Sequence, residues 1–111
     1  MSETKKAPEE IKEDIGVYVH ELEQEFEWEG QKYRELRFEF SQLKGSDLEA
    51  VETEMSIDGL FALAPEYSVA YQLKLAARAA HVHCSVLENL PIRDANAIRA
   101  KTKAFLTKGE F

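Results

Sequence analysis

Apolar and charged residues alternate on both sides of Gly30. Period-two alternation places apolar side chains on one face of a strand and charged side chains on the other. A glycine between two such runs supplies the positive φ of a tight turn. The pattern therefore predicts a half-buried β-hairpin with the apolar positions Leu22, Phe26, Trp28, Leu36, Phe38 and Phe40.

The parity of these positions predicts the register of the hairpin. A two-residue loop of Glu29 and Gly30 would put the apolar residues of the two strands on opposite faces. One additional loop residue, with a glycine bulge, brings both apolar sets to the same face. The expected pairs are then Trp28 with Lys32, Phe26 with Arg34, Gln24 with Leu36, and Leu22 with Phe38.

Three helices are predicted after the hairpin. The first begins in GSDLEAVETEM, residues 45–55, with Ser46 as N-cap and Glu49 completing a capping box. The second begins at Pro65 and the third covers residues 92–106. A lone hairpin is marginally stable in water, so its apolar face must pack against these helices. The predicted fold class is α+β, an N-terminal β-hairpin packed against about three α-helices.

The beginning of the chain differs in composition from the rest. Residues 1–15 are rich in Lys, Glu, Pro and Ala and cannot bury enough apolar surface to offset the entropy of ordering. We expect a disordered acidic tail over residues 1–19. Residues 20–111 are expected to form a single domain, since a chain of 111 residues can build one modest core.

Charge is distributed unevenly along the chain. The formal net charge of −7 lies in residues 1–29, which hold ten acidic residues and three lysines. From Tyr67 onward, seven basic residues stand against three acidic ones. Such an asymmetry can steer a partner, or it can reflect two solvated faces.

The sequence contains no signal for a membrane or an export pathway. No run approaches the roughly 18 apolar residues of a membrane-spanning helix. The first residues lack the apolar segment of a secretory signal, and the single cysteine cannot form an internal disulfide. We expect a cytoplasmic protein with no membrane partner.

His81, His83 and Cys84 are the residues most suggestive of metal chemistry, because they offer three ligand types within four positions. A zinc site would need a fourth ligand, and the sequence has no second pair of this kind. The alternative is a turn that ends a helix and leaves the cysteine half-buried. We therefore expect no metal site and no cofactor.

The remaining patterns do not favour catalysis. The chain has no phosphate-binding glycine loop and no serine in a nucleophile elbow. Its alternating glutamates lie on an exposed strand face, where they cannot act as a matched acid and base. We expect no catalytic residues and no enzymatic activity.

Nucleic-acid binding through the C-terminal helix is the alternative function. This helix carries Arg93, Arg99, Lys101 and Lys103. Helical spacing scatters these residues over much of its polar side, and the acidic protein opposes phosphate attraction at long range. Nucleic acid is therefore not the expected partner.

Apolar residues in the segment between the first two helices suggest a partner-binding surface. Phe61, Leu63, Tyr67 and Tyr71 lie in or just after this segment, and a small core has little room for all of them. Exposed aromatic patches often mark protein interfaces. The alternative is a loop folded onto the hairpin.

The order of several short motifs resembles the phage tail assembly chaperone family, in the branch of contractile-tailed, Mu-like and P2-like phages. The resemblance covers residues 20–107, and the stretches that carry it are FEWEGQKYRELRFEF, LKGSDLEAVE, APEYSVAYQLKLAARAAHV and VLENLPIRDANAIRAKTKAFL. The matching positions are Gly30, Tyr33, Leu36, Gly45, Asp47, Leu48, Ala80, Val82, Leu90, Pro91, Asp94, Phe105 and Leu106. Departures are the additional Gln31 after the glycine, Lys44 at a Thr-like position, and HVHC in place of a small apolar turn.

This resemblance implies a non-enzymatic protein that binds the tape measure protein, keeps it soluble and assists assembly of the tail tube. The major tail tube protein is a further expected partner. The location it implies is the cytoplasm of the bacterial host, outside the mature virion. We also expect a homo-oligomer if an edge of the hairpin is free, because edge strands can pair with another copy.

Overall fold

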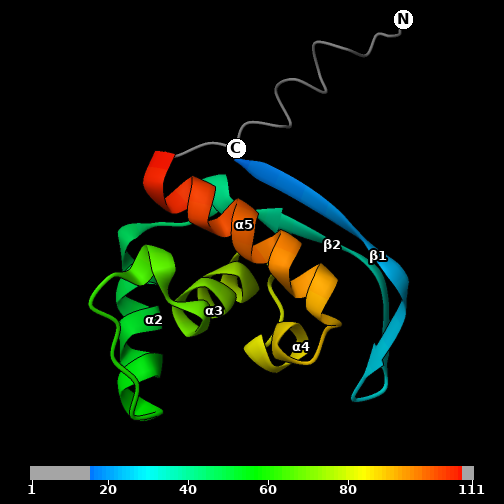
Figure 1. Cartoon of the computed structure of the whole chain (residues 1–111), viewed down its shortest axis with the longest axis horizontal. Coiled ribbons are helices and arrows are strands. Elements are labelled where there is room, and N and C mark those ends of the chain that lie inside the picture. Colours follow the sequence, from blue (N-terminus) through cyan, green and yellow to red (C-terminus); the bar gives the residue numbers. More distant parts are fainter. Residues whose placement is uncertain (1–15, 109–111) are drawn as a thin grey trace, which may run out of the picture.

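The computed structural model describes residues 16–108, and Figure 1 shows a curved hairpin beside a group of helices. This arrangement confirms the predicted α+β class. The elements are β1 (Val17–Trp28), β2 (Gln31–Glu39), α2 (Gly45–Ile57), α3 (Val69–Ala80), α4 (Cys84–Glu88) and α5 (Ile92–Lys108), with short 3-10 helices η1 (Phe40–Gln42) and η2 (Pro65–Tyr67).

The first strand begins earlier than the sequence pattern indicated. β1 starts at Val17, inside the tail that was predicted over residues 1–19. Residues 17–19 therefore belong to the sheet, not to the predicted tail. The rest of that predicted tail, residues 1–15, lies outside the described residues.

The predicted register of the hairpin is wrong. The loop has two residues, Glu29 and Gly30, whose φ values of 51° and 82° fit a type I′ turn. Trp28 consequently pairs with Gln31, and Phe26 pairs with Tyr33.

A bulge within β1, and not the expected additional loop residue, brings the apolar side chains of the two strands to the same face. Between Glu21 and Phe26, β1 has four residues where β2, between Tyr33 and Glu35, has one. This odd excess changes the face that the strand presents. Apolar residues from both halves of the hairpin reach one core as a result, namely Tyr18, Leu22, Phe26, Trp28, Tyr33, Leu36 and Phe38.

Helix α3 is the central element. It contacts β2, α2, α4 and α5, and Figure 1 shows it between the flanking helices. All residues from Tyr71 to Ala77 are buried, as expected for a helix covered on every side. Its small alanines allow these neighbours to approach closely.

Two apolar clusters meet at α3. The larger one joins the hairpin to α3, α4 and α5, and its fully buried residues include Phe38, Phe40, Leu87 and Ile98. The smaller one lies between α2 and α3 and consists of Val51, Met55, Tyr71 and Leu75.

The start of α2 is capped differently from the prediction. Lys44 occupies the N-cap position, and its N–H donates to Asp47 Oδ2 at 2.8 Å. Asp47 Oδ1 accepts from Arg78 Nε at 2.9 Å, which ties α2 to α3. These two bonds hold the pKa of Asp47 below its usual value. Asp47 thus has the role expected of Glu49, and the helix starts one residue before Ser46.

Candidate functional site

The four residues predicted to bind a partner have different surroundings. Phe61, Leu63 and Tyr67 are 84%, 90% and 65% exposed, whereas Tyr71 is 4% exposed. Tyr71 is buried because it is on the central helix, in the cluster that joins α2 to α3. Tyr71 is therefore not part of the exposed surface that the sequence suggested, and partner binding by all four residues stays a prediction.

Exposed apolar side chains gather in the connector between α2 and α3, residues 58–68. Among the described residues, nine large apolar side chains are exposed, and six of these lie between positions 57 and 69. The six are Ile57, Leu60, Phe61, Leu63, Tyr67 and Val69. We call the side chains of Leu60, Phe61, Leu63 and Tyr67 the connector surface. A local concentration of this kind is typical of interaction sites.

Backbone hydrogen bonds hold the first part of the connector in place. The Leu60 N–H donates to the Met55 carbonyl at 2.7 Å, and Gly59 has the positive φ, 76°, that the end of α2 requires. Ala62 then packs against the cluster between α2 and α3. Phe61 and Leu63 flank Ala62 and are exposed.

The second part of the connector is fixed by side chains of α3. The Gln72 side-chain amide, 1% exposed, donates to the Glu66 carbonyl. The Ser68 hydroxyl accepts from the Tyr71 N–H at 3.2 Å and so caps α3. The connector is therefore an anchored segment that presents apolar side chains to solvent.

A pocket of about 250 Å³ opens beside Phe61. Met55 and Tyr71 are its most buried lining residues, and Leu60, Phe61 and Pro65 contribute apolar surface from the connector and η2. Its polar lining comes from α2, as Glu52 and Ser56. Burial, and secondly the charge of Glu52, raise the pKa of Tyr71. We call this cavity the connector pocket.

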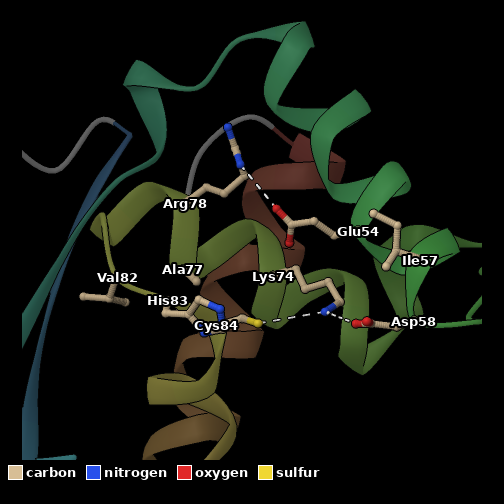
Figure 2. A pocket seen from close by; sticks show the side chains of 9 residues that line it. All are labelled: Glu54, Ile57, Asp58, Lys74, Ala77, Arg78, Val82, His83 and Cys84. Carbon is tan, nitrogen blue, oxygen red and sulfur yellow. Dashed lines mark hydrogen bonds and ion pairs between the residues drawn. The ribbon is translucent and has the colours of Figure 1, made fainter. Parts of the chain in front are cut away.

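A second pocket, of about 500 Å³, lies where α2, α3 and α4 meet. Figure 2 shows Lys74 between Asp58 and Cys84, and Arg78 beside Glu54. Lys74 Nζ is 2.9 Å from Asp58 Oδ2 and 3.9 Å from Cys84 Sγ, although its side chain is only 4% exposed. The bond to Asp58 raises the pKa of Lys74. Both basic side chains of this pocket are thus neutralised by carboxylates.

Cys84 in this pocket is not activated as a nucleophile. Burial and the neighbouring Glu88 raise the pKa of its thiol, and the charge of Lys74 offsets only part of that shift. A raised pKa keeps the sulfur protonated near neutral pH.

The histidines next to Cys84 point to different partners. His81 ends α3 in a left-handed conformation with φ 59°, and its Nε2 lies 3.6 Å from Glu39 Oε1. His83 caps α4, where its Nδ1 accepts from the Ser85 N–H at 3.1 Å. Within residues 16–108, no group of three or more His, Cys, Asp or Glu side chains has the geometry to hold a metal ion.

The basic residues of α5 are engaged with neighbouring side chains. Arg99 Nε donates to Gln72 Oε1 at 2.9 Å. Lys101 and Lys103 lie over the rings of Tyr18 and Tyr67, at 5.3 Å and 4.6 Å from the ring centroids. At the start of the helix, Arg93 is 82% exposed, and its Nη1 lies 3.9 Å from Glu23 Oε2; Lys108, in the last turn, is also exposed. These side chains do not form one continuous basic stripe of the kind that tracks a phosphate backbone.

Asp94 and His20 form a buried pair that sequence analysis did not predict. Asp94 Oδ1 lies 2.7 Å from His20 Nε2, and His20 Nδ1 lies 2.7 Å from the Tyr18 hydroxyl. With a proton on Nε2, the histidine donates to the carboxylate and accepts from the tyrosine, so both nitrogens are satisfied. This chain of bonds attaches β1 to the first turn of α5.

Sequence analysis also did not identify three residues that line the connector pocket, Glu52, Met55 and Pro65. One signal was readable in the sequence, because residues 45–68 hold six acidic residues and no lysine or arginine. The position of these residues around one cavity depends on how α2 and α3 pack, which no local pattern specifies.

Comparisons with family models, with curated proteins and with solved structures gave no match for this chain. Within residues 16–108, no helix has the length and apolar character needed to cross a lipid bilayer.

Proposed function

We propose that this protein is a phage tail assembly chaperone, a non-enzymatic protein that binds the tape measure protein and keeps it soluble while the tail tube assembles. The proposal starts from the motifs that resemble this family. The connector surface supports the proposal, because three large side chains that are 65% to 90% exposed, those of Phe61, Leu63 and Tyr67, lie on one anchored segment.

An exposed apolar surface of this kind suits an elongated helical client. Amphipathic helices bind partner proteins by placing their apolar stripe into an apolar groove. The connector pocket offers a recess beside Phe61 into which one side chain of such a stripe can insert. In this proposal the protein acts in the cytoplasm of the bacterial host, and the major tail tube protein is its second partner.

Co-expression with the tape measure protein of the same phage or prophage tests the proposal. We expect the tape measure protein to be soluble only when this protein is present, and the two to co-elute from a size-exclusion column. An insoluble tape measure protein, with this protein eluting alone, would contradict the chaperone function.

A matched pair of variants tests the surface. Phe61→Ala combined with Leu63→Ala removes two exposed side chains from the connector, and we expect co-elution to be lost. Ile92→Ala is the control, since Ile92 is 74% exposed but lies at the start of α5. Equal effects of the two variants would show that the connector is not the binding surface.

A further inference from the structure

The connector pocket has the size and lining to receive one bulky apolar side chain. Its volume is about 250 Å³, and an engineered apolar cavity of about 150 Å³ in another protein already admits benzene. Met55 and Tyr71, each 4% exposed, belong to the cluster between α2 and α3. An inserted side chain would therefore extend an existing core and lose its contact with water.

The stretch of chain that supplies most of this pocket's lining, residues 45–68, is acidic, and Glu52 is its one acidic residue that lines the pocket itself. Residues 45–68 contain no lysine or arginine, and their acidic residues are Asp47, Glu49, Glu52, Glu54, Asp58 and Glu66. Arg78 and Lys74 of α3 neutralise three of them, Asp47, Glu54 and Asp58. In the part of the chain that the structure describes, the other three have no ion pair.

Glu52 lies at the pocket itself, and Glu49 is exposed on the preceding turn of α2. One cation already lies against the connector surface, since Lys103 Nζ is 4.6 Å from the centre of the Tyr67 ring. On its α2 side, the connector surface borders the apolar recess and the carboxylates of Glu49 and Glu52, which have no ion pair within residues 16–108.

This combination determines which partner fits. A nucleic acid or an anionic membrane surface would be repelled by the carboxylates. An apolar segment bordered by acidic residues would place like charges opposite Glu49 and Glu52, which disfavours binding. An apolar stripe bordered by lysine or arginine would satisfy both the pocket and its rim.

We infer that the connector surface binds an amphipathic helix of another protein, with one bulky apolar side chain in the connector pocket and lysine or arginine side chains opposite Glu49 and Glu52. This inference rests on the proposed function, in which the client is a helical protein, and it adds the charge of the client segment.

Synthetic peptides of about 20 residues, long enough for partial helicity, provide the probe. The first carries leucine and phenylalanine on one helical stripe with lysines beside it, the second has the same stripe with glutamates, and the third has the composition of the first in scrambled order. Binding to the full-length protein is measured by fluorescence anisotropy at low and high salt. We expect the first peptide to bind about tenfold more tightly than the second at low salt, and the difference to shrink at high salt.

Variants of the protein locate the effect. Glu49→Gln with Glu52→Gln should weaken binding of the lysine peptide about fivefold, as expected for the loss of two exposed ion pairs. Glu35→Gln with Glu27→Gln is the matched control, because it removes two exposed charges from the hairpin and should leave binding unchanged. Phe61→Ser should weaken binding of both stripe peptides.

Three results would overturn the inference. They are equal binding of the lysine and glutamate stripe peptides, equally tight binding of the scrambled peptide, and equal weakening by the α2 charge variant (Glu49→Gln with Glu52→Gln) and the hairpin charge variant. A homodimer detected by analytical ultracentrifugation and abolished by Phe61→Ser would also overturn it, since a second copy would then occupy the surface.

The proposed function and this inference can fail separately. If the tape measure protein co-elutes but the peptides show no charge preference, the chaperone function stands and the inferred partner is wrong. If the lysine peptide binds as expected and the tape measure protein does not co-elute, the surface is correctly described and the client is a different protein.

Discussion

Asp94 and Phe61 have surroundings opposite to their chemistry, since the carboxyl group is 1% exposed and the phenyl ring is 84% exposed. Asp94 is on the hairpin side of the molecule, where His20 Nε2 is the partner of its Oδ1, whereas its Oδ2 is buried without a hydrogen-bond partner among the described residues. Phe61 is on the connector side, where Ala62 packs inward and holds the segment in place. The contrast suggests that the polar group is buried to fix the fold, whereas the aromatic group is not needed for folding and is available for binding.

The largest expected effect is on the hairpin side, from Phe38→Ala. Phe38 is fully buried, and its ring is stacked between Tyr18 and Phe40 at centroid distances of 5.9 Å and 6.0 Å. We expect a loss of about 4 kcal/mol in the free energy of unfolding, from lost burial and from the cavity that remains. Urea unfolding followed by circular dichroism measures it, and a loss below about 1 kcal/mol would show that this core is loosely packed.

Asp94→Ala tests the buried polar pair and should have the next largest effect. Removal of the carboxylate leaves His20 Nε2 buried without its partner, at an expected cost of about 3 kcal/mol. Asp94→Asn keeps an oxygen that can accept from His20, so its loss should be smaller. If both variants are as stable as the wild type, the pair does not hold β1 on α5.

Asp47→Ala tests the start of α2, the helix that leads into the connector. The loss of its bonds to Lys44 and Arg78 should cost about 1 kcal/mol near neutral pH. Because folding lowers the pKa of Asp47, its contribution is complete above the usual aspartate pKa of about 4 and is lost as pH falls through the folded-state value. The stability difference from wild type should therefore shrink in acid.

Glu49→Ala is the control for this prediction. Sequence analysis assigned the capping role to Glu49, whereas the structure gives it to Asp47. We expect Glu49→Ala to change the free energy of unfolding by less than about 0.5 kcal/mol at any pH. A loss as large as that of Asp47→Ala would restore the predicted capping box.

The smallest effect on stability is expected from Phe61→Ala, although the substitution is the same as at Phe38. The Phe61 side chain is mostly in water, so its truncation should change the free energy of unfolding by less than about 0.5 kcal/mol. The same variant should weaken binding of the lysine stripe peptide. A destabilisation comparable to that of Phe38→Ala would show that the ring supports the fold, which would remove the contrast between the two regions.

The local pattern of the sequence predicted the hairpin and the three longer helices, whereas the short helix α4 (Cys84–Glu88) was expected to be a turn. Alternation predicted the hairpin, because strand periodicity depends only on which side chains face a core. The second helix was predicted to begin at Pro65, but the structure has the short η2 (Pro65–Tyr67) there, and α3 begins only at Val69. The sequence left two alternatives open for Phe61, Leu63 and Tyr67, an exposed surface or a loop folded onto the hairpin, and in the structure all three are exposed.

Features that depend on distant parts of the chain were predicted wrongly or missed. A shift by an odd number of residues was needed to bring the apolar side chains of both strands to one face. The alternation of residues does not say where this shift occurs, and the structure has it in the middle of β1 instead of in the loop. Tyr71 is close in sequence to the exposed residues, yet it is buried because α2 covers that face of α3.

The sequence by itself determined the hairpin, the three longer helices, the apolar character of the segment between α2 and α3, and the excess of acidic residues over positions 45–68. Only the tertiary structure decided that Asp94 meets His20 across 74 positions and that Met55, Phe61 and Tyr71 surround one pocket. The physical reason is that secondary structure follows from interactions between near neighbours in the chain. Burial and pairing depend instead on which elements pack together, and that packing is decided by the whole core.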